Sequence, residues 1–109
     1  MFELRTYESP SEKAHLSKVK MFSEMGEIEI FKRVGLTPVF FSRTLAGPRM
    51  PSLVYMLVHE DMAGREKSWD NFRNDPEWKK VSAASEVNGK LVLKVDRIWL
   101  DPTDFSALK

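Results

Sequence analysis

The stretch SLVYMLVHEDMAGREKSWDNFRNDPEW, residues 52–78, decides the fold because a strand pattern passes directly into a helix pattern. Leu53 to His59 is an apolar run typical of a strand, and Glu60-Asp61 supplies a helix cap. Helical spacing follows in Met62, Arg65, Trp69 and Phe72. The segment Asn74-Asp75-Pro76 then restarts the helix with a new cap and a first-turn proline. We therefore expect a strand followed by an interrupted helix.

The same two patterns occur in the first half of the chain. Residues 2–8 alternate and predict a strand, with Phe2, Leu4 and Thr6 on one face and Glu3, Arg5 and Tyr7 on the other. The segment 9–12 reads as a helix start, with Ser9 as the cap.

The first helix carries an apolar face of Leu16, Val19, Phe22 and Gly26, with Lys13, Lys20, Glu24 and Glu27 on the opposite arc. Gly26 predicts a break, because glycine costs about 1 kcal/mol in a helix interior. Burial resumes at Ile30, and Gly35 ends the helix in a left-handed cap.

Two further segments complete the sheet. Residues 39–45 predict a strand that pairs antiparallel with 53–59 through a short loop. Asn88-Gly89 stops the last helix, and 90–100 predicts the final strand, with a bulge where the apolar positions change parity. The order βαββαβ predicts an α+β, ferredoxin-like fold with a four-stranded antiparallel sheet.

Right-handed crossovers place both helices on one face of this sheet. The strand parity assigns Phe41, Leu53, Tyr55 and Leu57 to the uncovered face. An apolar face of this kind requires a cover, so we expect a homodimer.

Composition limits the class of protein. The chain has 109 residues, no cysteine, and 17 basic against 16 acidic residues, a net charge of +1. One domain over residues 1–109 is expected, without disulfides or thiolate metal sites. The interleaved charges argue against nucleic-acid binding. We expect no leader and no membrane span, with a cytoplasmic location as the default.

Four segments together resemble the NIPSNAP family: FELRTY at residues 2–7, the stretch 52–78, NGK at 88–90, and LDPTDFS at 100–106. The resemblance implies a ferredoxin-like unit that pairs sheet to sheet into a dimeric α/β barrel. It also admits a tandem arrangement in which this chain is one of two units. The location is then open, because the longer chain could be an exported one. It implies no general reaction.

Five residues are candidates for a pocket inside that barrel: Glu3, Arg5, Tyr7, Tyr55 and His59. Arginine binds carboxylates through a planar fork, while tyrosine and histidine orient substrates or move protons. The competing interpretation is a Glu3–Arg5 ion pair at the sheet or dimer surface, with space-filling tyrosines. We expect no metal site, since no acidic residue stands at ligand spacing from His15 or His59. We expect no cofactor, because phosphate-loop and dinucleotide motifs are missing from the sequence.

A complete fold pattern without a catalytic set favours a dimeric module that binds a small hydrophobic ligand or a protein partner. The alternative is a cofactor-independent monooxygenase or isomerase that acts on a hydrophobic substrate inside the barrel. No residue is assigned a catalytic role.

Overall fold

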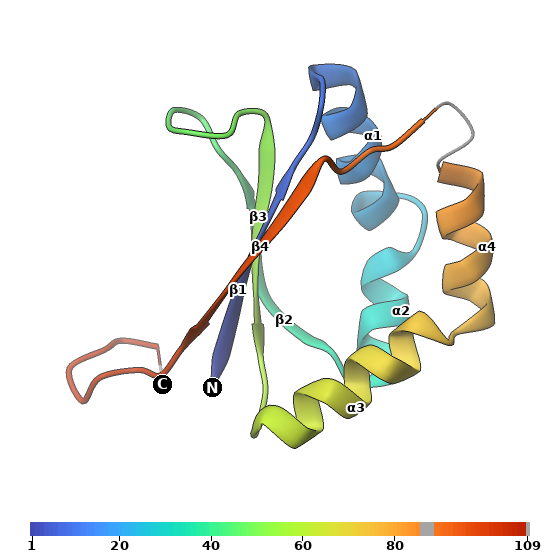
Figure 1. Ribbon diagram of the computed structural model, residues 1–109. Helices are drawn as coiled ribbons and strands as arrows, with labels where there is room; N and C mark the ends of the chain where they lie inside the picture. Colours follow the sequence, from blue (N-terminus) through green and yellow to red (C-terminus); the bar gives the residue numbers. More distant parts are fainter. Residues whose placement is uncertain (86–88, 109) are drawn as a thin grey trace.

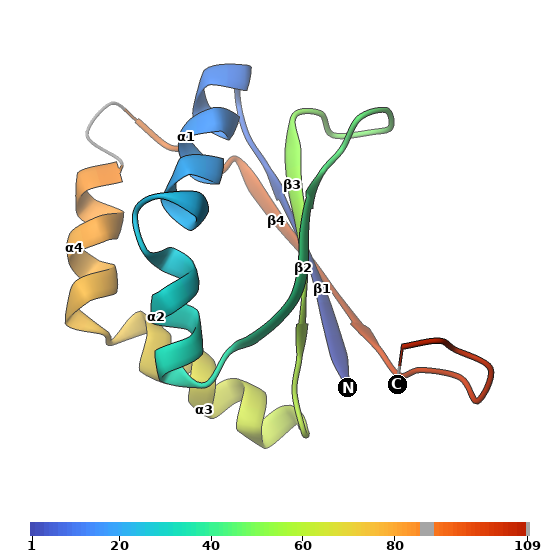
Figure 2. The ribbon, with the colours of Figure 1, turned by 180° about the vertical axis from the view of Figure 1, so that it is seen from behind.

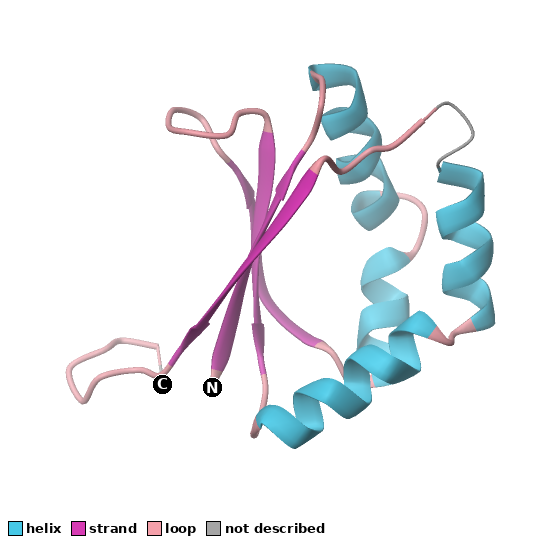
Figure 3. Ribbon diagram, viewed as in Figure 1, coloured by secondary structure: helices cyan, strands magenta, loops and turns pink. Residues whose placement is uncertain are grey.

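The computed structural model describes residues 1–85 and 89–108. It is an α+β fold (Figures 1 and 3) with the element order β1 (Phe2–Glu8), α1 (Glu12–Ser23), α2 (Glu27–Val34), β2 (Thr37–Arg43), β3 (Ser52–Val58), α3 (Met62–Arg73), α4 (Pro76–Ser85) and β4 (Lys94–Leu100). None of the helices in the described residues is both long and apolar enough to cross a membrane.

The four strands form one open antiparallel sheet in the order β2-β3-β1-β4. The central strand β1 pairs with β3 on one side and with β4 on the other. This is the strand order of a ferredoxin-like fold, so the predicted fold class is confirmed. The closed barrel needs a second sheet and stays a prediction.

All four helices lie on one side of the sheet (Figures 1 and 2). Between them and the sheet lies a core rich in aromatic rings. The ring of Phe31, on α2, meets Trp69 at 5.7 Å and Phe72 at 4.9 Å between centroids, both nearly edge to face. The predicted burial of Trp69 and Phe72 is confirmed, whereas Met62, assigned to the same stripe, is exposed at the start of α3.

Glycines divide and end the first helical region as expected. Gly26 lies between α1 and α2 with φ 84°, and Gly35 caps α2 with φ 98°. Glycine adopts this left-handed conformation without the steric cost that a side chain brings. The cap of α1 differs from the prediction: Ser11 accepts the Ala14 amide, and Ser9 precedes the helix.

The helical face predicted for α1 is rotated. Leu16 is 54% exposed, whereas Glu27, assigned to the solvent arc, is buried at the start of α2. The turn at Gly26 changes the direction of the helix axis, so one wheel does not describe residues on both sides of it.

The last strand is shorter than predicted. It begins at Lys94, and its pairing with β1 is continuous, without the expected bulge. The change of parity reflects apolar residues on both faces: Val95 packs on the core, while Ile98 lies on the other face. Asn88 of the predicted Asn88-Gly89 stop lies outside the described residues.

The assignment of sheet faces was wrong. Leu53, Tyr55 and Leu57 are buried under the helices, and Phe41 packs against the same core. Alternate side chains point to opposite faces of a strand, so the uncovered face carries the other set. Its apolar residues are Phe2, Leu4, Phe40, Val54, Met56, Val58, Ile98 and Leu100.

Candidate functional site

The five pocket candidates lie together, but on the helix-covered face rather than the open one. Arg5 and Tyr55 are register partners on β1 and β3, so both strands present their odd-numbered residues to the helices. All five side chains are buried, and Glu3 and Tyr55 have no exposed surface. They form a polar cluster inside the domain, and His59 at its edge also borders a pocket.

The Glu3 carboxylate is the centre of this cluster. Its Oε1 accepts from Arg65 Nε at 2.9 Å, His59 Nε2 at 2.9 Å and Trp69 Nε1 at 3.1 Å. Its Oε2 accepts from Arg5 Nη1 at 2.8 Å and Arg65 Nη2 at 3.0 Å. Burial alone raises the pKa of such a carboxyl, but the donated hydrogen bonds outweigh it and lower the pKa to about 2. Glu3 is therefore ionised at neutral pH.

The ion pair of the competing interpretation is present, though in the interior. The Arg5 guanidinium binds Glu3 and stacks 4.2 Å from the Trp69 ring centroid. It also donates to the Tyr7 hydroxyl from Nη2 at 3.3 Å. Burial acts to lower the Arg5 pKa, whereas the hydrogen bonds with Glu3 and Tyr7 act to raise it, and the net shift is upward, so the cation persists in the core.

The two tyrosine hydroxyls extend the cluster under α1. Tyr7 Oη and Tyr55 Oη lie 2.6 Å apart, and either can donate. Burial, followed by the coulombic effect of Tyr7, raises the Tyr55 pKa well above its ordinary value. Tyr55 is thus a hydrogen-bonding group rather than an anion at neutral pH.

A second buried ion pair, Lys18–Glu27, escaped the sequence analysis. Lys18 Nζ lies 3.2 Å from Glu27 Oε1, with both side chains almost fully enclosed. Burial raises the pKa of Glu27 to about 7, although Lys18 acts in the opposite direction. The ammonium also lies 5.4 Å from the Tyr7 ring centroid, which joins the pair to the cluster. Lys18 shares one helical face of α1 with the buried residues Ala14, Met21 and Phe22, three or four positions away. This spacing is the sequence signal that predicts a buried Lys18.

The sequence analysis also did not identify Arg65 as a polar residue of the site, because its helical spacing with Trp69 suggested a packing role. From the first turns of α3 it binds both oxygens of Glu3, and its guanidinium lies 5.1 Å from the Trp99 ring centroid. Trp99 is the register partner of Glu3 on β4 and is 43% exposed. Arg65 therefore connects the buried carboxylate with the surface.

His59 ends this cluster near the start of α3. Burial lowers its pKa, an effect that the hydrogen bond to Glu3 opposes. Because Glu3 is ionised, it accepts a hydrogen bond from Nε2–H and thereby selects the tautomer of the neutral ring. His59 also borders a pocket of about 280 Å³ with Gly35, Thr37, Val58, Glu60, Gly64 and Ser68.

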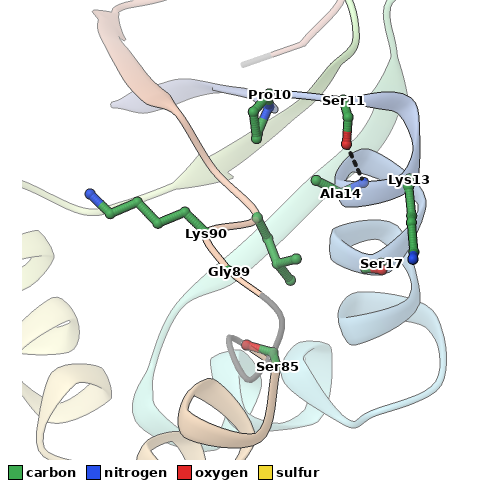
Figure 4. Close-up of a pocket in the computed structure, with 9 residues that line it drawn as sticks. Pro10, Ser11, Lys13, Ala14, Ser17, Ser85, Gly89 and Lys90 are labelled. Carbon is green, nitrogen blue, oxygen red and sulfur yellow. Dashed lines mark hydrogen bonds between the residues drawn. The ribbon is translucent and has the colours of Figure 1, made fainter.

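A separate pocket of about 270 Å³ lies between the start of α1 and the end of α4 (Figure 4). Its described lining includes Ser11, Lys13, Ser17, Ser85 and Lys90, none of them a predicted candidate. The Ser11 hydroxyl shown there is engaged in capping α1. The described residues that line this pocket do not belong to the Glu3 cluster. Among residues 1–85 and 89–108, no group of three acidic or histidine side chains is arranged to hold a metal ion.

A comparison with protein families identifies the lineage of this fold. The family model described as NIPSNAP matches residues 2–107. The chain belongs to the NIPSNAP family. The family resemblance of the sequence is thus confirmed over nearly the whole chain. Curated proteins gave no match.

Solved structures of other NIPSNAP proteins share the fold. A NIPSNAP family protein from Agrobacterium tumefaciens strain C58 superposes with a TM-score of 0.83 at 23% identity, over 99% of this chain and 97% of that chain. An uncharacterized NIPSNAP domain protein from Burkholderia xenovorans gives a TM-score of 0.77 at 18% identity, over 96% of each chain. Likeness at this identity concerns the fold alone.

Proposed function

We propose that this NIPSNAP chain is a homodimeric binding module that pairs through its uncovered sheet face and binds a small ligand beside the Glu3 cluster. The observation that carries the proposal is the apolar character of that face. Phe40, Ile98 and Leu100 are 41%, 51% and 40% exposed there. Soluble monomers seldom present a continuous apolar surface of this kind, and an apolar patch is complementary to a copy of itself.

The C-terminal segment supplies a second argument for a copy of this chain as the occupant. It extends beyond the sheet on the side away from the helices (Figure 2), and its Phe105 is 90% exposed. On the same face a pocket of about 280 Å³ is lined by Phe2, Met56, Leu100 and Leu108, among others. In the proposed dimer, the projecting ring of each chain packs into the apolar pocket of the other.

Light scattering tests the pairing. The unmodified chain of 12.6 kDa is expected at twice that mass, and Ile98→Asp at the mass of one chain. Leu16→Asp is the matched control, because Leu16 is 54% exposed on α1, on the helical side. A monomeric mass for the unmodified chain, or equal effects of the two substitutions, refutes the proposal. Leu57 is unsuitable for this test because it lies in the core and reports on folding.

The ligand part of the proposal rests on the charged cluster. Buried ionic groups with displaced pKa values are more frequent at functional sites than in ordinary cores. Here Glu3, Arg5 and Lys18–Glu27 lie together under the helices, and Arg65 leads from them to the surface. The cluster supports recognition of a polar or charged group on a small molecule.

A second candidate function, a cofactor-independent monooxygenase or isomerase for a hydrophobic substrate, is favoured by the contact between the Tyr7 and Tyr55 hydroxyls. A proton can pass between two phenols at 2.6 Å, next to the Arg5 cation. Oxygen uptake with an added hydroquinone tests the monooxygenase. Such an enzyme is expected to lose turnover in Tyr7→Phe, and uptake equal in both proteins excludes a role for this pair.

A further inference from the structure

The starting point is a pair of arginines that face each other across two strands. Arg5 on β1 and Arg97 on β4 are register partners, so their side chains leave the same face of the sheet. Directly opposite residues in an antiparallel pair have Cβ atoms about 5 Å apart, and like charges there are destabilising. Arg5 is buried, whereas Arg97 is exposed. The exposed positive charge of Arg97 thus lies on the same face of the sheet as the buried cation of Arg5.

A third arginine adds to this charge. Arg65 reaches over the neighbouring register pair, Glu3–Trp99, and keeps 14% of its side chain exposed. Both Arg5 and Arg65 already share the single carboxylate of Glu3. Two guanidinium groups therefore share one carboxylate, and Arg97 adds a third positive charge opposite Arg5 on the exposed edge strand β4.

An aromatic surface lies within the same group. The Trp99 ring is 43% exposed, with Arg65 against it at 5.1 Å, and Trp99 projects from the same face as Arg97, two residues before it. A planar guanidinium binds a carboxylate through two parallel hydrogen bonds, and an exposed indole offers a stacking surface for a second ring. The positive charges of Arg97 and Arg65 and the stacking surface of Trp99 thus lie next to one another.

We propose that Arg97, Arg65 and Trp99 form a binding site for a small aromatic carboxylate. The carboxylate of the ligand binds the exposed guanidinium of Arg97, which relieves the repulsion between Arg97 and Arg5, while Arg65, held by Glu3, adds positive charge and the ligand ring stacks on the exposed part of Trp99. All three residues come from one chain and from the helix-covered side of the sheet, where α3 also lies (Figure 1). The inference rests on the proposed binding function for its ligand and is independent of pairing through the open face.

Isothermal titration of the full chain with benzoate tests the site, with benzamide as the uncharged analogue of the same shape. We expect one benzoate per chain and at least tenfold weaker binding of benzamide. Arg97→Gln is expected to weaken benzoate binding about tenfold, because a hydrogen-bonded ion pair is lost. Arg43→Gln is the matched control, since Arg43 is also an exposed arginine but belongs to β2, at the opposite edge of the sheet.

A second variant, Trp99→Ala, and a second anion, inorganic phosphate, test the stacking and the charge separately. Trp99→Ala is expected to weaken benzoate several-fold and to leave the weaker binding of inorganic phosphate unchanged. Phosphate binding as tight as benzoate overturns the aromatic specificity. Equal affinities for benzoate and benzamide, no heat with either, or equal effects of Arg97→Gln and Arg43→Gln overturn the site. Light scattering on the same samples reports pairing separately, so failure of the ligand class is distinguished from failure of the dimer.

Discussion

Replacement of Glu3 by glutamine tests the charged cluster at its centre. The substitution keeps the shape but removes the negative charge that Arg5 and Arg65 share. A carboxyl whose pKa falls from 4.5 to about 2 on folding stabilises the protein by about 3 kcal/mol at neutral pH. Loss of one partner from a buried ion pair costs a similar amount, about 3–5 kcal/mol. We therefore expect Glu3→Gln to lower the free energy of unfolding by about 3 kcal/mol at pH 7.

The pH dependence of this loss is specific to the cluster. Because the pKa of Glu3 is lowered in the folded chain, its contribution is complete above pH 4.5 and disappears as the pH falls towards 2. The difference between the two proteins should then shrink from pH 7 to pH 3.

Urea unfolding followed by tryptophan fluorescence measures both effects. A slope of roughly 1.5 kcal/mol per molar urea converts the loss at pH 7 into a midpoint lower by about 2 M. Glu8→Gln, the same substitution on the other face of β1, is the control and should change stability by less than about 0.5 kcal/mol. Equal midpoints at pH 7, or a difference that does not change at pH 3, would refute the central role of Glu3.

Two further predictions concern the same core. Trp69→Ala should destabilise the domain by about 3–5 kcal/mol, because it removes a buried ring and a donor to Glu3; an unchanged thermal midpoint would contradict the packing described. The pKa of Glu27 is raised to about 7 by burial, so the stability that its protonated form gives below pH 4.5 is lost as the pH rises to 7. Glu27→Gln should therefore remove part of the fall in stability between pH 5 and pH 8, as measured by urea unfolding; an identical fall in both proteins would show that Glu27 is not the titrating group.

The sequence predicted most of the fold because local rules dominate at the element boundaries. Gly26 and Gly35 adopt left-handed conformations that other residues avoid. Asp61 caps α3, because its side-chain oxygen accepts the Gly64 amide. The sequence failed at the first cap, where Ser9 and Ser11 both fit the pattern and only the structure distinguishes them.

The orientation of the sheet could not be predicted from alternation alone. In β3 both sets of alternate residues are apolar, with Val54 and Met56 on one face and Leu53 and Leu57 on the other. A hydrophobic pattern of this kind says which residues share a face but not which face the helices cover. The polar cluster decides it, since Glu3 and Arg5 find partners on α3 in Arg65 and Trp69.

The sequence predicted one part of the candidate site and not the other. The five residues of β1 and β3 could be grouped by strand parity, whereas Lys18, Glu27 and Arg65 follow the polar pattern of solvent-facing helix positions. Burial of such groups depends on partners distant in the chain, and no local rule identifies those partners.

The central place of β1 also determines the order in which the domain can form. The first strand of the domain pairs with the last, from Phe2 opposite Leu100 to Glu8 opposite Lys94. Contacts between such distant residues slow folding, because a long loop must close before they form. Glu3 has no complete set of donors until α3 is in place, and Arg97 does not face Arg5 until β4 has joined the sheet. A chain cut between β3 and α3 would therefore leave a charged strand without its partners, and neither fragment would be expected to fold alone.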